Sequence, residues 1–351
     1  MREVAVVGFA QAPNVRRDAF RNEVEIVMPV VREAMERSGL KKGEVGFTCS
    51  GSSDFLAGQP FAFVTTLDAV GPWPPIEESH VEMDGAWALY EAWVRLQHGD
   101  IDSALVYGFG KSSLGDVRDV MTMQLDPYCM QPLWPDSIAM AALQARAMLD
   151  AGACSERDMA GIAVRSRRDA KTNANAQLAG DFDADALLAA PCIASPLRKH
   201  DCAPITDGAA AVVLAAGDLA RRISKRPAWI RGIDHRIEAH HPGMRDLTQS
   251  PSTALAAQEA GATGRAFDVA ELYAPFTHQE IILRDAIGLN GATAINPSGG
   301  ALAANPLMAA GLIRIGEAAQ RIIDGDARSA VAHATSGPCL QQNLVCVLEA
   351  D

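Results

Sequence analysis

Two stretches of the chain, far apart in the sequence, follow the same pattern. LQHGDIDSALVYGFG at 96–110 and IIDGDARSAVAHATS at 322–336 each end a long apolar helical segment at Gly-Asp and continue into an apolar strand with a small-residue end. A repeat of this kind predicts two copies of one βα-rich unit. We therefore expect an N-terminal half at 1–225, with a cap inserted at about 111–200, and a C-terminal half at 226–351.

Apolar strand and helix patterns alternate within both halves. Residues 3–8 are typical of a buried strand, and 24–40 carry apolar residues at helical spacing up to a terminal glycine. We expect a further helix at 58–71 and a strand at 267–276 that leads into a loop. Such alternation favours an α/β fold with right-handed crossovers. An active site is expected where the two copies meet, at helix starts and strand ends.

The composition excludes several classes of protein. A net charge of -12 over 351 residues argues against nucleic acid as a partner, because duplex binding needs a basic face. The apolar runs are too short to span a membrane, and the N-terminus lacks the pattern of a secretion signal. We expect a cytoplasmic protein that does not bind membranes.

The cysteines and histidines indicate neither disulfides nor metal. The 7 cysteines are scattered and never form a C-x-x-C pair, which predicts free thiols in a cytosolic chain. His235, His240 and His241 lack companion ligands at metal spacing, so a polar loop is favoured there over a zinc site. We expect no bound metal.

Two carboxylates stand at the entrance of the apolar helix within 80–100. Asp84 suits an N-cap, and Glu82 suits a first turn, where the helix dipole favours acids. Both positions are equally open to a role in a site, and the residues alone do not decide between the two interpretations.

Motifs in both halves carry a resemblance to a known family. DCAPITDGAAAVVLA at 201–215 and AINPSGG at 294–300 resemble patterns of the thiolase superfamily, in its sterol-carrier-protein-type or lipid-transfer branch. The resemblance covers nearly the whole chain. It implies a five-layered α-β-α-β-α fold, a homodimer and coenzyme A thioesters as substrates. Coenzyme A would be part of the substrate, and no cofactor would be bound permanently.

The chain departs from that family at its catalytic positions. Against the family's Cys-Ala-Ser-Gly run, Glu82 falls on the nucleophilic cysteine and Asp84 on the serine. Tyr273, in YAPF, falls on the histidine of the His-Asp-x-Phe motif, and Asn305, in ANP, on that of Gly-His-Pro. Cys339 lies a few residues beyond the family's Cys-Gly-Gly acid/base site.

These replacements suit a reaction without a covalent intermediate. Thiolysis needs a nucleophile, whereas retro-aldol cleavage of a β-hydroxy thioester needs a base, an enolate stabiliser and a proton donor. Tyr273 suits the base or the donor. The N–H groups of Ser298, Gly299 and Gly300 and the Asn305 amide suit the enolate oxygen. Glu82 and Asp84 would orient the tyrosine or shuttle a proton.

Each candidate also has a structural interpretation. Tyr273 suits a packed aromatic residue, Asn305 a turn, His278 a helix start and Cys339 a small buried residue. Arg165 and Arg168 lie in a basic run that suits either a solvated face or the coenzyme A phosphates. The catalytic candidates are Tyr273, Glu82, Asp84, Asn305, Cys339 and His278, and those for substrate or coenzyme A binding are Ser298, Gly299, Gly300, Arg165 and Arg168.

Three functions follow from these interpretations. The first is an acyl-CoA aldolase, a carbon–carbon lyase, that acts on a bulky β-hydroxyacyl-CoA of steroid side-chain type together with a small OB-fold partner, as the resemblance implies. The second is a thiolase or acyltransferase that uses a displaced cysteine such as Cys339 on a β-ketoacyl-CoA. The third is a non-catalytic acyl-CoA or lipid carrier subunit of a complex.

Overall fold

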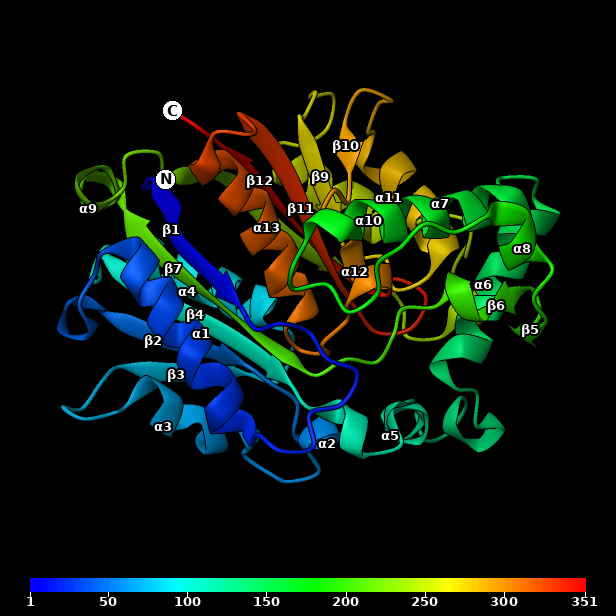
Figure 1. The fold of residues 1–351 in the computed structure, drawn as a ribbon, viewed down its shortest axis with the longest axis horizontal. Helices are drawn as coiled ribbons and strands as arrows, with labels where there is room; N and C mark the ends of the chain where they lie inside the picture. The colour runs from blue at the N-terminus through cyan, green and yellow to red at the C-terminus, as the bar shows by residue number, and fades with distance from the viewer.

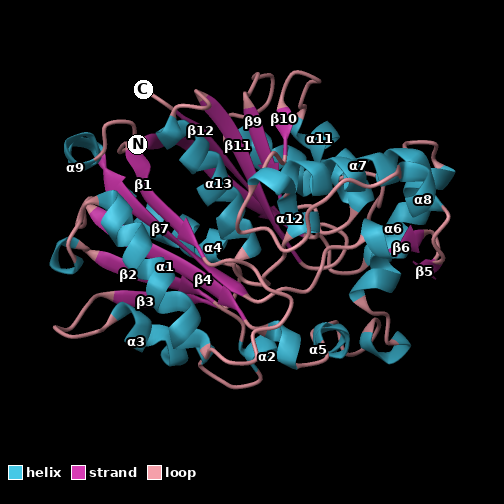
Figure 2. Ribbon diagram, in the orientation of Figure 1, coloured by secondary structure: helices cyan, strands magenta, loops and turns pink.

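The computed structural model describes residues 1–351, and most of its strands belong to one mixed sheet. The first half contributes β1 (Val4–Gln11), β2 (Phe47–Gly51), β3 (Glu78–Val81), β4 (Ser103–Gly110) and β7 (Gly208–Ala216). The second half contributes β8 (Ala228–Ile237), β9 (Val269–Leu272), β10 (Ala294–Ile295), β11 (Ser329–Ser336) and β12 (Gln342–Glu349). The strand order is β10-β9-β11-β12-β8-β1-β7-β4-β2-β3 (Figure 2).

The two halves of this sheet have the same topology. In each half the first strand, β1 or β8, pairs antiparallel with the last, which pairs antiparallel with β4 or β11. The next strand outward, β2 or β9, and the edge strand, β3 or β10, continue in parallel. The halves join where Ala5 faces Trp229 and Val6 faces Ala228. The predicted duplicated α/β fold is confirmed, and we propose the boundary between the halves at 225/226.

Helices fill the space between the half-sheets and cover their outer faces. α4 (Gly85–His98) and α13 (Ala310–Asp324), labelled in Figure 1, share a buried apolar cluster with strands of both halves. α1 (Glu23–Ser38) packs on the other face of the first half-sheet. α10 (Pro251–Glu259) and α11 (Thr277–Ile287) cover the outer face of the second. These are the five expected layers.

The repeated Gly-Asp motif ends the two central helices in the same way. Gly99 after α4 and Gly325 after α13 have φ angles of 83° and 90°. A left-handed residue at this position lets the chain leave the helix, and glycine adopts it without a Cβ clash. Both helices then lead within a few residues into a buried strand, β4 or β11.

The insertion in the first half packs against the second half. It contains α5 (Val117–Met123), α6 (Ser137–Asp150), α7 (Glu156–Asp169), α8 (Ala184–Leu188) and the hairpin of β5 (Cys192–Ala194) and β6 (Leu197–Arg198). α6 and α7 both contact α11, and α7 also contacts α12 (Gly300–Ala303). The remaining helices are α2 (Asp54–Ala57), α3 (Leu67–Val70) and α9 (Gly217–Ile223).

Two expected elements differ in the structure. The helix expected at 58–71 is broken into a 3-10 turn at 62–66 and α3, because Phe61 has a φ of 55° and the Thr65 and Thr66 hydroxyls bond back to carbonyls three residues earlier. The strand expected at 267–276 is shorter, since its parallel pairing with β11 ends at Leu272. None of the helices combines the length and apolarity that crossing a bilayer would require.

Candidate active site

A pocket of about 380 Å³ opens at the entrance of α4, where segments of both halves meet. Half of its lining residues are apolar, and the polar ones include a carboxylate and two serine hydroxyls. This is the region in which the duplicated pattern predicts an active site. The lining residues are Ser53, Phe55, Glu82, Met83, Met123, Gln124, Met308 and Ser336.

Asp84 is a buried carboxylate shared by two helix starts. It accepts hydrogen bonds from the backbone N–H of Ala86 in α4 and of Gly311 and Leu312 in α13, each at 2.9 Å. A Cβ on Gly311 would lie 2.6 Å from its carboxylate, so glycine permits this approach. Burial raises the pKa of Asp84, whereas the three N–H groups and the nearby Arg314 lower it. Asp84 is the N-cap of α4, and it also satisfies donors of α13, which has no capping side chain of its own.

Glu82 is the exposed acid of the pocket lining. Its oxygen Oε1 accepts a hydrogen bond from the Asp54 N–H at 2.7 Å. Asp54 in turn holds the next turn of chain, because its carboxylate accepts from the N–H groups of Phe61 and Ala62. Glu82 therefore fixes the start of α2, and its second oxygen has no partner in the chain.

Tyr273 follows β9 and lies against the glycine loop. Its ring packs on Ala301, which directly follows that loop, and on Ala310 at the start of α13. Its hydroxyl forms no hydrogen bond with another residue of the chain. Burial raises the pKa of Tyr273, the negative charge of Asp84 raises it further, and Arg314 lowers it. The phenol is therefore neutral at pH 7 and has a proton to donate.

Asn305 lies between α12 and α13, where the two family-like motifs meet. Its backbone N–H donates to the Thr206 hydroxyl at 2.9 Å, and Thr206 also forms a bridge with Pro306. The side-chain oxygen Oδ1 of Asn305 is buried and has no hydrogen-bond partner. A buried amide oxygen without a partner is costly, which is typical of a group positioned for something outside the chain.

The backbone N–H groups of the glycine loop form hydrogen bonds within the chain. The Ser298 N–H and hydroxyl donate to Glu271 at 3.1 and 2.7 Å. The N–H of Gly299 donates to the Asn296 carbonyl at 2.8 Å, and that of Gly300 to the Ser298 hydroxyl at 3.2 Å. Each of these three N–H groups already has an acceptor within the chain, and their role in holding an enolate oxygen stays a prediction. Contact of the loop with coenzyme A stays a prediction.

A buried ion pair supports this loop. Arg314 of α13 donates to the Glu271 carboxylate at 2.8 Å and to the Ser298 hydroxyl at 2.7 Å. Glu317, one turn further along α13, accepts from the Asn173 amide at 3.2 Å. Burial raises the pKa of Glu317, and the charge of Glu271 raises it further. Arg314 and Arg321 lower the pKa of Glu317, so positive charge offsets part of the repulsion between the two carboxyl groups.

His278 and Cys339 are buried outside the pocket lining. His278, in the first turn of α11, lies 3.2 Å from Gln144 through Nε2, and burial lowers its pKa to about 3, so it is neutral. The Cys339 thiol donates to the Met140 carbonyl at 3.4 Å, and burial raises its pKa to about 11. Both environments agree with the structural interpretations, as a helix start and a small buried residue. Their catalytic roles stay predictions.

The two arginine candidates on α7 lie in different environments. Arg165 pairs with Glu280, a buried carboxylate that also accepts from the Asn296 amide at 3.1 Å. Its charge is therefore partly used inside the protein, next to the glycine loop. Arg168 is exposed, and its Nε donates to the neighbouring Asp169 carboxylate at 2.9 Å. For both, contact with coenzyme A stays a prediction.

Sequence reasoning missed most of the pocket lining. Ser336 ends β11, and Met308 precedes α13 with a φ of 72° while its carbonyl accepts from the Gly85 N–H at 2.9 Å. Phe55 and Met123 come from segments of the first half that the pattern did not connect with a site. Methionine and phenylalanine are ordinary core residues, so only the fold distinguishes them as pocket residues.

The duplicated five-layered architecture is that of thiolases, and comparisons with known proteins agree. The chain is 27% identical to the benzoylsuccinyl-CoA thiolase subunit BbsB of Thauera aromatica over 229 residues, 56% of this chain and 59% of that protein. It is 26% identical to an acetyl-CoA acetyltransferase of Methanothermobacter thermautotrophicus over 371 residues, 93% of this chain and 94% of that one.

Two further similarities concern a lyase and an aldolase. The chain is 23% identical to the 17-hydroxy-3-oxo-4-pregnene-20-carboxyl-CoA lyase of Mycobacterium tuberculosis over 314 residues, 82% of this chain and 79% of that protein. The solved Ltp2-ChsH2(DUF35) aldolase shares the fold with a TM-score of 0.80, at 20% identity and over 99% of this chain and 98% of that one. No family model matches. These similarities support a protein of the thiolase superfamily, of the lipid-transfer type.

Proposed function

We propose that this protein is an acyl-CoA aldolase, which cleaves a bulky β-hydroxyacyl-CoA by a retro-aldol reaction without a covalent intermediate. The observation that carries the proposal is the position of Asp84. Its carboxylate occupies N–H groups at the starts of both α4 and α13. A helix start is where a nucleophilic thiolate gains stabilisation. A fixed carboxylate at this place takes up those donors and repels a second negative charge.

The pocket composition supports the same proposal. No cysteine is among the lining residues, and the lining carboxylate Glu82 is the residue that falls on the family's cysteine in the sequence resemblance. The apolar side chains of Phe55, Met83, Met123 and Met308 suit a large hydrocarbon group on the substrate. A steroid side chain as that group is part of the proposal, supported by the name of the lyase relative.

The reaction needs no oxidant and no acyl acceptor. A base takes the proton of the β-hydroxyl group, the bond between the α and β carbons breaks, and a carbonyl forms at the β carbon. The electron pair moves into the thioester enolate, whose α carbon then takes a proton. The products are a ketone or aldehyde and a shortened acyl-CoA, with no net change of protons.

The environments of the two main candidates suggest their roles. Tyr273 stays neutral because its pKa is raised, so we assign it as proton donor to the enolate and not as the base. Glu82 is the lining carboxylate with a free oxygen, and we assign it as the base. The Asn305 side chain, whose buried oxygen has no partner, is assigned to orient the thioester.

Acyl transfer is a second candidate, favoured by the names of the thiolase and acetyltransferase relatives. It would require a nucleophile, and Cys339 is the displaced cysteine nearest to the family position. The burial that raises the pKa of Cys339 to about 11 keeps this thiol protonated at neutral pH. A carrier subunit is the third candidate, and the name of one relative, which calls it a subunit, is compatible with it.

Assembly is part of the proposal as well. A small OB-fold partner is proposed, and the solved aldolase, whose name joins Ltp2 with ChsH2, is in line with a two-protein enzyme. We also propose a homodimer and a cytoplasmic location. The test therefore includes the chain alone and the chain together with a candidate partner.

The decisive experiment measures products by mass spectrometry. A β-hydroxyacyl-CoA with a branched or steroid-type chain should yield a carbonyl compound and a shortened acyl-CoA without added coenzyme A. Tyr273→Phe should lower kcat more than tenfold, over ~1.4 kcal/mol of transition-state stabilisation. Glu82→Gln should also lower kcat, whereas Tyr128→Phe, at an exposed tyrosine, should not.

Three other outcomes would overturn the proposal. Thiolysis of a β-ketoacyl-CoA without any carbonyl release would favour acyl transfer. An acylated side chain trapped during turnover would exclude a non-covalent mechanism. Activity of a complex that Tyr273→Phe leaves unchanged would favour the carrier function.

A further inference from the structure

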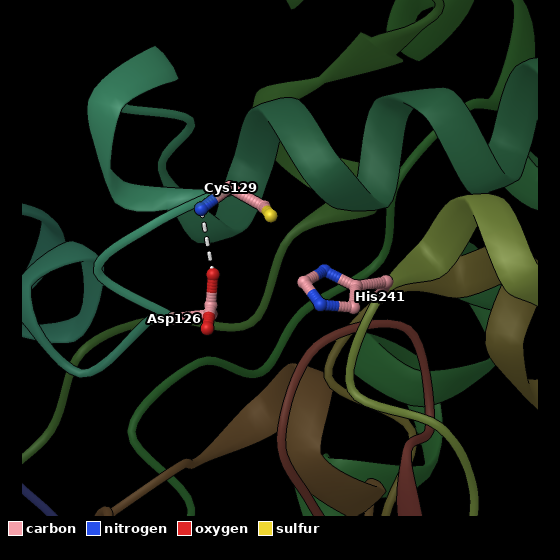
Figure 3. Close-up of side chains that lie close together, drawn as sticks. All are labelled: Asp126, Cys129 and His241. Carbon is pink, nitrogen blue, oxygen red and sulfur yellow. Dashed lines mark hydrogen bonds between the residues drawn. The ribbon is translucent and has the colours of Figure 1, made fainter.

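Three potential metal ligands converge beside the pocket. Asp126 and Cys129 belong to the loop between α5 and α6, and His241 belongs to the loop between β8 and α10. One ligand atom of each lies within 4.8 Å of the other two. Figure 3 shows the carboxylate, the thiol and the imidazole pointing toward a common space. Cys129 is exposed and the other two are partly exposed, so an ion can enter from solvent.

The backbone already holds this arrangement. The Asp126 oxygen Oδ1 accepts from the N–H groups of Tyr128 and Cys129 at 3.2 and 2.6 Å, which fixes the turn DPYC. The Asp126 N–H donates to Nε2 of His240 at 3.0 Å, which ties this turn to the second loop. His241 follows directly, and its ring lies 5.7 Å from that of His240. The backbone thus joins the loops, and the His241 ring accepts and donates no hydrogen bond there. The hydrogen bond from the Cys129 N–H lowers the pKa of Asp126, and the Cys129 thiol lies close enough to that carboxylate that a hydrogen bond between the two side chains helps to lower it.

We propose that Asp126, Cys129 and His241 bind one zinc ion, with water as the fourth ligand. A thiolate, an imidazole and a carboxylate are a zinc set, whereas magnesium and calcium prefer oxygen alone. Zinc bonds of about 2.0–2.3 Å place tetrahedral ligands about 3.3–3.6 Å apart. Closing the present triangle to that size needs shifts of about 1 Å in side chains that are not fully buried. Binding replaces the thiol proton, which is released to solvent.

The ion would join two walls of the pocket. Met123 and Gln124, which line the pocket, directly precede the turn that holds Asp126. The second loop is fixed to the segment after β11, because Arg245 donates to the carbonyls of Pro338 and Cys339 at 2.8 and 3.0 Å. That segment directly follows Ser336, another lining residue and the last residue of β11. Zinc would therefore hold the cap of the first half against the second half at the mouth of the pocket, whatever reaction the pocket performs.

The test uses zinc and cobalt ions with the tag-free full-length chain. After loading and gel filtration, elemental analysis should find about one zinc per chain. Cobalt should give the thiolate-to-metal charge-transfer band of a cysteine ligand. Cys129→Ser should abolish that band and weaken metal binding at least about tenfold. His241→Ala should also weaken metal binding at least about tenfold. Cys192→Ser, at another exposed free cysteine, should change neither.

Several outcomes would overturn the site. Cobalt binding without a thiolate band, or a band that persists in Cys129→Ser, would exclude this cysteine. Equal zinc affinity in the wild type, Cys129→Ser and His241→Ala would mean adventitious binding elsewhere. Circular dichroism of the variants separates loss of ligand from loss of fold, and the exposed position of Cys129 makes Cys129→Ser the variant expected to fold normally.

Discussion

α4 and α13 hold equivalent places in the two halves, but the charged residues near their starts differ in sign. Aligned by the Gly-Asp motif that follows each helix, Ala88 of α4 corresponds to Arg314 of α13, and both are buried. The first half supplies the acid, Asp84, that serves both helix starts, and the second half supplies Arg314 and Tyr273. The comparison teaches that duplication kept the apolar packing while the polar groups were divided between the copies.

The largest expected loss of stability comes from removing the buried charge of Arg314. Arg314→Met should lower the free energy of unfolding by about 4 kcal/mol, because it leaves the buried Glu271 carboxylate without a positive charge beside it. Leu89→Met, at a buried apolar residue in the same part of α4, should cost less than about 1.5 kcal/mol. Urea denaturation measures both. If both variants lose the same free energy of unfolding, the ion pair of Arg314 with Glu271 contributes no more to stability than ordinary apolar packing does. Adding Glu271→Gln to Arg314→Met should recover part of the loss.

The next effect concerns the shared cap. Asp84→Ala should lower the free energy of unfolding by about 3 kcal/mol, since three buried N–H groups lose their acceptor. Asp183→Ala removes the exposed cap of the single helix α8 and should cost only about 1 kcal/mol. Thermal or urea unfolding of the two variants gives the comparison. A loss for Asp84→Ala no larger than that for Asp183→Ala would mean that α13 does not depend on this carboxylate.

The smallest effect compares two buried histidines of the second half, His278 and His333, with the exposed His80 and His98 of the first half. Burial lowers the pKa of His278 to about 3 and that of His333 to about 4, so both are neutral in the folded chain. The unfolded chain binds these protons below pH 6.5, and stability is therefore lost as the pH falls from there. At pH 5 the loss is about 2 kcal/mol for each histidine.

Replacing either buried histidine by glutamine removes its share of the stability loss at low pH. Between pH 7.5 and pH 5, His278→Gln and His333→Gln should each lose about 2 kcal/mol less stability than the wild type. His98→Gln should follow the wild type. Urea titrations at the two pH values provide the numbers, and parallel losses in all four proteins would contradict neutral burial of these rings.

The fold could be predicted from the sequence because its signals are local. Helical spacing and the repeated Gly-Asp endings depend on neighbouring residues, and they led to the duplicated α/β class. The N-cap interpretation of Asp84 was available for the same reason. The failure at 58–71 is also local, since apolar spacing there was read without the positive φ of Phe61 and the threonine hydroxyls that close separate turns.

The site was harder to predict because its contacts join distant segments. No spacing rule connects Arg165 with Glu280, or Asp84 with Gly311, and these contacts decide which charges remain free. The glycine loop was expected to offer its N–H groups, but Glu271 and internal acceptors use them. His241 looked isolated for the same reason, since Asp126 and Cys129 lie in the other half.

The exchange between the two helix starts has a consequence for how the protein can be divided. Asp84 satisfies donors of α13, and in return the Gly85 N–H donates to the Met308 carbonyl. Neither copy is self-sufficient at this point, so a half made alone would expose the backbone groups that its sister normally covers. We therefore expect the two halves to unfold together, and neither half to fold when it is produced alone.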